Sequence, residues 1–205
     1  MTTRQDHWES VYASRAPTEV SWHQDTPTSS LALIDHCGVG REASILDVGG
    51  GASRLVDHLL ALGYVDVSVL DISDAALAHA KLRLGSRAAA VRWIVGDVTL
   101  AELGGPYDVW HDRAVFHFLC DAADRERYRA QLDRALRPHG HVVVATFALD
   151  GPERCSGLPV VRYSPATLGR ELGPSFTLIE TWDEEHLTPA GKVQRFVFCR
   201  FRRGA

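Results

Sequence analysis

Two hydropathy patterns alternate along the chain from Ala43 onward. Short, nearly continuous apolar runs predict buried strands, and they lie at Ser44–Val48, Val65–Leu70, Val91–Val95, Tyr107–His111 and His141–Phe147. Apolar residues spaced three and four apart predict helices between these strands, at Ser53–Leu62, Asp74–Leu84 and Asp124–Leu136. Strands that alternate with helices favour a parallel sheet with right-handed crossovers.

The pattern changes after Phe147 and is different again before residue 41. Residues 149–163 are rich in Gly and Pro and predict a loop or lid, and a short helix follows at Ala166–Leu172. The next two stretches, Phe176–Leu187 and Val193–Phe201, read as strands joined by a hairpin connection, so the sheet should end in an antiparallel pair. The first forty residues predict a helical extension whose large side chains cover other parts of the protein; these are Trp8, Tyr12, Trp22 and His23.

Composition excludes several classes of protein. The chain has 205 residues, 45% of them apolar and 23% charged, with a net charge of −4. Those values are typical of a globular domain and leave no overall positive field for nucleic acid. The four cysteines stand far apart without a CxxC pair, so we expect no metal site and no disulfide framework. We find neither a signal peptide nor a membrane segment and expect a cytoplasmic protein.

The most informative segment runs from Ile45 to Ser53. A buried strand leads into three glycines, at positions 49–51, and a helix follows at once. Glycines allow a ligand to approach the backbone, although an ordinary strand-to-helix turn would show the same residues. Asp71 ends the second strand twenty residues after Gly51, where nucleotide sites of α/β sheets place a ribose ligand, and Asp97 ends the third strand. These three strand ends together predict a nucleotide site.

Two common nucleotide motifs are not matched. A dinucleotide fingerprint would need a glycine at position 54, where Arg54 stands, and this disfavours it. A phosphate-binding P-loop would need Gly-Lys-Ser/Thr after the glycines, which is absent.

The motifs resemble those of class I S-adenosylmethionine-dependent methyltransferases. The resemblance rests on Asp-Val-Gly-Gly-Gly-Ala-Ser53, Asp71, Val-Gly-Asp-Val98 and Tyr-Asp-Val-Trp-His-Asp112. It covers the chain from about Ile34 to the C-terminus, and it departs mildly at Ser53, where the family often has a third glycine. It implies an α/β, Rossmann-like, seven-stranded sheet of order 3-2-1-4-5-7-6 with the last strand antiparallel and helices on both faces.

The resemblance also implies how the chain is organised and which cofactor it uses. We expect a single domain over 1–205, made of a helical extension or lid (1–40), a cofactor-binding half (41–148), and a substrate loop with the C-terminal hairpin (149–205). S-adenosylmethionine would be the methyl donor and S-adenosylhomocysteine the product. Asp71 would accept the ribose hydroxyls, Asp97 the adenine amino group, and Asp47 would orient the glycine turn. The full set expected at the cofactor is Trp22, Asp47, Gly49, Gly50, Gly51, Arg54, Asp71, Ile72, Asp97, Val98 and His111.

Methyl transfer needs positioning and desolvation above all, and a base only when the acceptor arrives protonated. Candidates for the reacting centre follow the fourth strand and are His111, Asp112 and His117. Candidates for acceptor binding are Arg113, Arg154, Arg162 and Tyr163. The alternatives are a packed histidine at 117, a helix cap at Asp112, and surface charge for the arginines of the loop. We assign no catalytic or binding role to Cys155.

We therefore predict a methyltransferase that acts on N, O or S of a small molecule, as a monomer or homodimer. A protein-lysine methyltransferase is the alternative, because Trp8–Tyr12 and Glu-Val-Ser-Trp-His23 resemble the entry segment of that subfamily. A non-catalytic nucleotide-binding or interaction module is a second alternative, and a dehydrogenase comes last. We expect no nucleic-acid or membrane partner.

Overall fold

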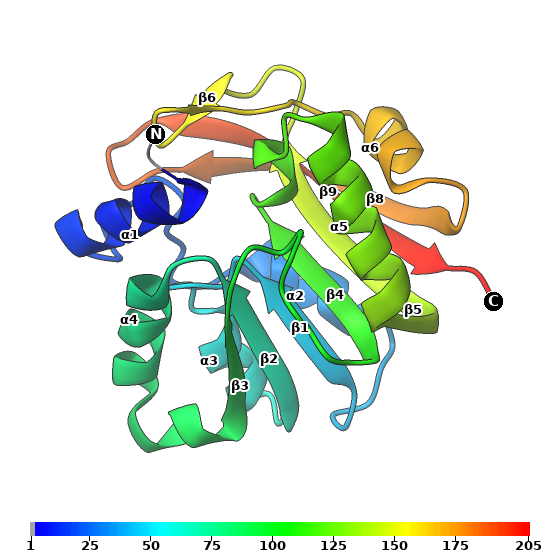
Figure 1. The fold of residues 1–205 in the computed structure, drawn as a ribbon, viewed down its shortest axis with the longest axis horizontal. Helices are drawn as coiled ribbons and strands as arrows, with labels where there is room; N and C mark the ends of the chain where they lie inside the picture. Colours follow the sequence, from blue (N-terminus) through cyan, green and yellow to red (C-terminus); the bar gives the residue numbers. More distant parts are fainter. Residues whose placement is uncertain (1–2) are drawn as a thin grey trace.

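The computed structural model describes residues 3–205 and contains a seven-stranded sheet (Figure 1). Its strands lie in the order β3-β2-β1-β4-β5-β9-β8. They are β1 (Ser44–Val48), β2 (Asp66–Asp71), β3 (Val91–Val95), β4 (Tyr107–Arg113), β5 (Leu136–Phe147), β8 (Phe176–Leu187) and β9 (Val193–Arg203). Strand β9 is antiparallel to both of its neighbours, and the other pairs are parallel. The predicted order and the antiparallel last strand are confirmed.

A small hairpin interrupts the predicted loop and lies outside the seven-stranded sheet. It consists of β6 (Arg154–Cys155) and β7 (Leu158–Pro159), which pair only with each other. The pattern of Gly and Pro in this segment did not predict it.

Helices cover both faces of the sheet. They are α1 (Arg4–Ser14), α2 (Thr28–Asp35), α3 (Leu55–Ala61), α4 (Asp74–Leu84), α5 (Ala122–Ala135) and α6 (Pro165–Leu172), with short 3₁₀ turns η1 (Gly85–Ala90) and η2 (Phe116–Phe118). One cluster of buried side chains joins the sheet to α2, α3 and α4, and the other joins it to α5 and α6. Neighbouring strand residues alternate between them, as the period of two in a strand requires: Ile45 belongs to the first cluster and Leu46 to the second.

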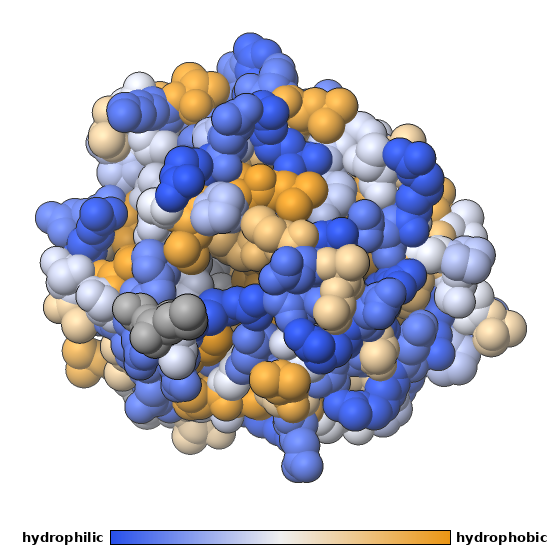
Figure 2. Space-filling view, turned by 45° about the horizontal axis from the view of Figure 1, so that its top comes forward, coloured by the Kyte–Doolittle hydropathy of each residue, from blue (hydrophilic) through white to orange (hydrophobic). Residues whose placement is uncertain are grey.

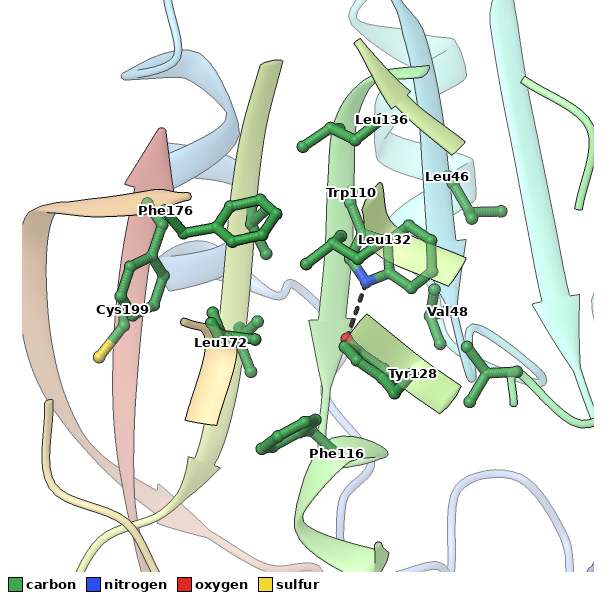
Figure 3. Close-up of a cluster of buried hydrophobic side chains, with 14 of the residues drawn as sticks. Leu46, Val48, Trp110, Phe116, Tyr128, Leu132, Leu136, Leu172, Phe176 and Cys199 are labelled. Atoms are coloured by element: carbon green, nitrogen blue, oxygen red, sulfur yellow. Dashed lines mark hydrogen bonds between the residues drawn. The ribbon is translucent and has the colours of Figure 1, made fainter. Parts of the chain in front are cut away.

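The second cluster holds the largest fully buried side chain, Trp110 of β4. Its indole Nε1 donates a hydrogen bond of 2.8 Å to the Tyr128 hydroxyl of α5 (Figure 3). That hydroxyl donates in turn to Asp112 Oδ2 at 2.7 Å. The core is therefore connected to the C-terminal end of β4.

Several element boundaries differ from the sequence prediction. Strand β4 continues to Arg113, because Asp112 and Arg113 stay in register with Val144 and Ala145 of β5. Strand β5 begins at Leu136, directly where α5 ends, five residues before the predicted start. Helix α3 starts at Leu55 because the glycine turn continues through Ser53.

The N-terminal helix α1 lies beside α4 at one end of the sheet (Figure 1). The Glu9 carboxylate accepts hydrogen bonds from Ser73 Oγ, Asp74 N and Ala75 N, at 3.0, 2.7 and 3.2 Å. A carboxylate at a helix N-terminus satisfies free N–H groups and complements the helix dipole. Glu9 thereby anchors α1 to the start of α4. None of the helices within residues 3–205 is both long and apolar enough to cross a bilayer.

Candidate functional site

Two adjoining cavities open at the carboxyl ends of the parallel strands. The larger encloses about 740 Å³ between atoms, part of it open to solvent, and the smaller about 550 Å³. Gly49, Tyr12, Trp22, Val48 and Arg113 line both. Figure 2 shows apolar side chains around a hollow in one face of the molecule. In open α/β sheets this edge is where ligands bind.

The glycine turn separates the two cavities, and its geometry requires glycine. Gly49 has a φ of +67°, and a Cβ there would lie 2.1 Å from Val115 Cγ2. A Cβ on Gly50 would lie 2.4 Å from Asp47 Oδ2. Both amides donate to the carbonyl of Leu70, at 2.7 and 3.1 Å, which fixes the turn against β2. The predicted glycines thus shape the floor of the site.

Asp71 ends β2 and lines the larger cavity, as its sequence position predicts. Only 6% of the residue is exposed, and Oδ1 accepts a hydrogen bond of 2.9 Å from Ser73 N. Burial raises the pKa of Asp71 to about 7, opposed by the hydrogen bond from Ser73 N. The carboxylate is available to accept hydroxyl groups, and Ile72 lies beside it in the cavity wall.

Asp97 also lines this cavity, but its carboxylate already has partners. Oδ1 accepts from Thr99 N and Oγ1, and Oδ2 accepts from Arg4 Nη1 at 2.7 Å. Arg4 also reaches Asp124 of α5 at 2.5 Å. The sequence predicted a free acceptor for an adenine amino group, whereas the structure shows one of the two oxygens engaged by α1. Val98 lines the same wall.

His111 belongs to the smaller cavity and lies within β4 rather than at its end. Its Nδ1 is 2.7 Å from Asp47 Oδ1, and its Nε2 is 2.9 Å from Ser30 Oγ on α2. Both ring nitrogens are therefore engaged, which disfavours the predicted proton transfer at an acceptor. Asp47 Oδ2 is buried without a hydrogen-bond partner within residues 3–205, so the site holds one carboxylate oxygen that a bound cationic group could satisfy.

Asp112, one of the candidates for the reacting centre, takes a structural position in the turn that follows β4. It is fully buried and lines neither cavity. Its carboxylate accepts from Val115 N, Phe116 N and the Tyr128 hydroxyl. Burial raises its pKa to about 6, opposed chiefly by the bond from Tyr128. Asp112 fixes the turn that follows β4, which is the role of a cap.

The structure places His117 as a packed histidine. Its ring is fully buried between Phe118 and Phe147, at centroid distances of 4.5 and 4.7 Å, and Nδ1 accepts from Phe147 N at 3.3 Å. Burial lowers the pKa of His117 to about 3, so the ring is neutral at physiological pH. It lines neither cavity.

Replacing His117 by alanine should therefore lower stability and leave turnover nearly unchanged. The loss of a buried ring and of its hydrogen bond should cost about 1–3 kcal/mol of unfolding free energy. Urea unfolding and the kcat of methyl transfer, measured on the same preparation, check this. A large fall in kcat at unchanged stability would contradict it.

Three of the predicted acceptor-binding residues do not face the cavities. Arg154 donates to Gly157 O, and Arg162 to Gly151 O and to the exposed Glu153. Tyr163 is buried against Phe116. In the same loop, Cys155 of the β6–β7 hairpin lines the larger cavity. Burial raises the pKa of Cys155 to about 11, so it is a thiol.

Arg54, predicted at the cofactor, also lies outside both cavities and pairs with Asp25 at 3.6 Å. Arg113 is the predicted acceptor residue that the structure does bring to the site. Trp8, Tyr12 and Trp22 close the larger cavity from the N-terminal side, and Trp22 Nε1 donates to the Tyr12 hydroxyl at 3.2 Å. Sequence reasoning missed Arg4 and Ser30, because a lone arginine and serine in polar segments carry no periodic signal.

Comparisons with known proteins agree with this geometry. A family model described as "Methyltransferase domain" matches residues 46–142, which include the glycine turn, Asp71 and Asp97. The chain carries a methyltransferase domain and resembles the class I S-adenosylmethionine-dependent methyltransferases. The methyl donor of such proteins is S-adenosylmethionine, and three of the residues predicted at the donor, Gly49, Asp71 and Asp97, line the larger cavity.

Among curated proteins, the methyltransferase is 27% identical over 139 residues to the eEF1A lysine and N-terminal methyltransferase of Mus musculus. The match covers 67% of this chain and 20% of that protein, so the chain spans about a fifth of the relative's length.

Two solved structures are similar in fold. N-methyltransferase NodS from Bradyrhizobium japonicum, in complex with S-adenosylhomocysteine, has a TM-score of 0.75 at 16% identity, covering 99% of this chain and 100% of that one. A 1,6-didemethyltoxoflavin-N1-methyltransferase from Burkholderia thailandensis has a TM-score of 0.68 at 22% identity, covering 95% and 81%.

Proposed function

We propose that this methyltransferase transfers the methyl group of S-adenosylmethionine to a nucleophilic N, O or S atom of a small-molecule acceptor. The observation that carries the proposal is the position of α1. Trp8 and Tyr12 of that helix, with Trp22, line the larger cavity together with Asp71. A cavity closed in this way suits a small molecule better than a folded protein surface.

The residues present fit the donor. Asp71 would accept the ribose hydroxyls, and the wall formed by Ile72 and Val98 would contact the adenine. The unpartnered Asp47 Oδ2 and the glycine turn would face the amino-acid end of the donor. Asp47 is held in place by His111, whose other ring nitrogen contacts Ser30. The donor supplies an electrophilic sulfonium methyl when bound.

The chain's own contribution to the reaction is positioning and exclusion of water. The described walls of the larger cavity carry no free histidine or thiolate, since His117 is turned into the core and Cys155 is protonated. An acceptor that reacts without a protein base fits this arrangement. Aromatic side chains would hold the acceptor in line with the methyl group, and such positioning contributes several kcal/mol to rate. We propose that α1 acts as the lid over this site.

A lysine of another protein is the second candidate acceptor, favoured by the similarity to the mouse lysine and N-terminal methyltransferase. A lysine would have to enter past Trp8 and Trp22 and lie close to the Arg113 guanidinium, which lines the same cavity. Like charges in a desolvated site oppose this.

Transfer of a labelled methyl group separates the two acceptor classes. The enzyme with radiolabelled donor is given either the small-molecule fraction or the protein fraction of a cell extract. We expect label to appear in the small-molecule fraction, and the Asp71→Asn variant gives the background. Label confined to protein would contradict the small-molecule proposal and support the lysine alternative.

A further inference from the structure

Arg113 is the one guanidinium that lines both cavities, among the residues that the structure describes. Its side chain is 11% exposed, and its Nη1 donates to Trp22 O at 3.0 Å. Within residues 3–205, Nε and Nη2 have no hydrogen-bond partner. Nη2 forms an ion pair with Glu184, whose Oε1 lies 3.6 Å away, beyond hydrogen-bond length, and also accepts from Gln24.

A buried cation with unmade hydrogen bonds is costly unless a ligand supplies the partner. Burial lowers the pKa of Arg113, which reflects this desolvation. The position is nevertheless fixed from two sides, by the bond to Trp22 O and by the Phe196 ring, whose centroid lies 4.7 Å from the guanidinium carbon. The guanidinium is therefore held in place, and the edge formed by Nε and Nη2 makes no hydrogen bond, although Glu184 supplies a counter-charge.

The edge formed by Nε and Nη2 is suited to one kind of group. Nε–H and one N–H of Nη2 are parallel donors, and this side of a guanidinium matches the two oxygens of a carboxylate. Beside it in the larger cavity stand Trp8, Trp22 and Phe118, with Trp8 in edge-to-face contact with the other two at 5.7 and 5.1 Å. Aromatic walls of this kind contact flat apolar groups.

We propose that Arg113 is a specificity residue that selects an acceptor with an aromatic body and a carboxylate. The inference rests on the proposed function, because it names the acceptor class of the same cavity. Arg113 forms a bidentate pair with the carboxylate, while the aromatic body lies against Trp8, Trp22 and Phe118. The donor also carries a carboxylate, so the experiment has to distinguish the two sources.

The test measures binding to protein saturated with S-adenosylhomocysteine. Matched acids and amides are titrated calorimetrically: benzoate and benzamide, salicylate and salicylamide, indole-3-acetate and indole-3-acetamide. We expect at least one acid to bind about 10-fold or more tightly than its amide, the factor that a desolvated charged pair gives. In Arg113→Gln the preference should fall to about 2-fold or less, with the affinity for S-adenosylhomocysteine unchanged within about 3-fold.

Two further variants keep the result interpretable. Arg113→Lys retains the charge without the parallel donors, so it should fold and lose most of the preference. Arg162→Gln is the matched control, because this arginine lies outside both cavities and should leave the preference intact.

Each other outcome overturns the inference in a different way. Wild-type protein that binds no acid more tightly than its amide contradicts it, as does a preference that survives in Arg113→Gln and Arg113→Lys. A 10-fold loss of S-adenosylhomocysteine affinity in Arg113→Gln would assign the arginine to the donor's carboxylate. Folded wild-type protein that binds no S-adenosylhomocysteine would contradict the proposed function itself and this inference with it.

Discussion

Replacing Asp71 by asparagine should weaken S-adenosylmethionine binding about 100-fold or more. The carboxylate at the end of β2 would accept two hydroxyl hydrogen bonds, and bonds to a charged group contribute about 1.5–3 kcal/mol each. Asparagine keeps the shape and offers one neutral acceptor in place of two charged ones. Calorimetric titration of both proteins at pH 8 gives the ratio of dissociation constants.

The same substitution should stabilise the protein without donor. Burial raises the folded-state pKa of Asp71 to about 7, from an ordinary value of 3.8. The native state therefore binds more protons than the unfolded state between these two values, and stability falls as pH rises through this window. The free-energy cost of ionising the buried Asp71 is absent below the unfolded-state pKa and complete above about pH 7.

Asparagine carries no such penalty. The midpoint temperature of thermal unfolding should therefore be higher for Asp71→Asn than for the wild type at about pH 8. The difference should shrink toward about pH 4. Lower stability of the variant at pH 8, or unchanged donor affinity in a folded variant, would contradict the role given to Asp71.

The second large effect is expected in the core. Replacing Trp110 by alanine should reduce the unfolding free energy by about 3–5 kcal/mol. The side chain is fully buried between β4 and α5, and its loss leaves a cavity and removes the donor to the Tyr128 hydroxyl (Figure 3). Urea unfolding followed by far-ultraviolet circular dichroism measures the change.

Tyr128→Phe is the matched control for this prediction. It removes the hydroxyl that links Trp110 to Asp112 but keeps the ring, so its cost should be smaller, about 1–3 kcal/mol. If Trp110→Ala lowers the unfolding free energy no more than Tyr128→Phe does, the core repacks around the missing indole and the prediction is contradicted.

The sequence predicted the sheet because its signals are local. Buried strands such as Ser44–Val48 are short and mostly apolar, and Ser73 caps α4 with its Oγ, which accepts from Ala76 N at 3.1 Å. Glycine positions followed from the same local logic, since the turn at Gly49 needs a positive φ. The order of the strands followed from the family resemblance, because hydropathy periodicity alone does not give a strand order.

The candidate site was predictable only where a strand end fixes the side chain. Asp71 follows directly from β2, whereas the orientation of His117 depends on how η2 packs against Phe147. Arg162 instead donates to Gly151 O, and the hairpin earlier in its loop has strands of two residues each, too short for a sequence pattern. The Arg4–Asp97 bond joins residues 93 positions apart, and nothing in either local sequence encodes it.

Calorimetric titration of the wild-type protein with S-adenosylhomocysteine and, separately, with NAD tests the assigned cofactor most directly. We expect a single saturable site for S-adenosylhomocysteine, lost in Asp71→Asn, and no saturable heat with NAD. The absence of S-adenosylhomocysteine binding by folded protein, or tighter binding of NAD, would contradict this assignment.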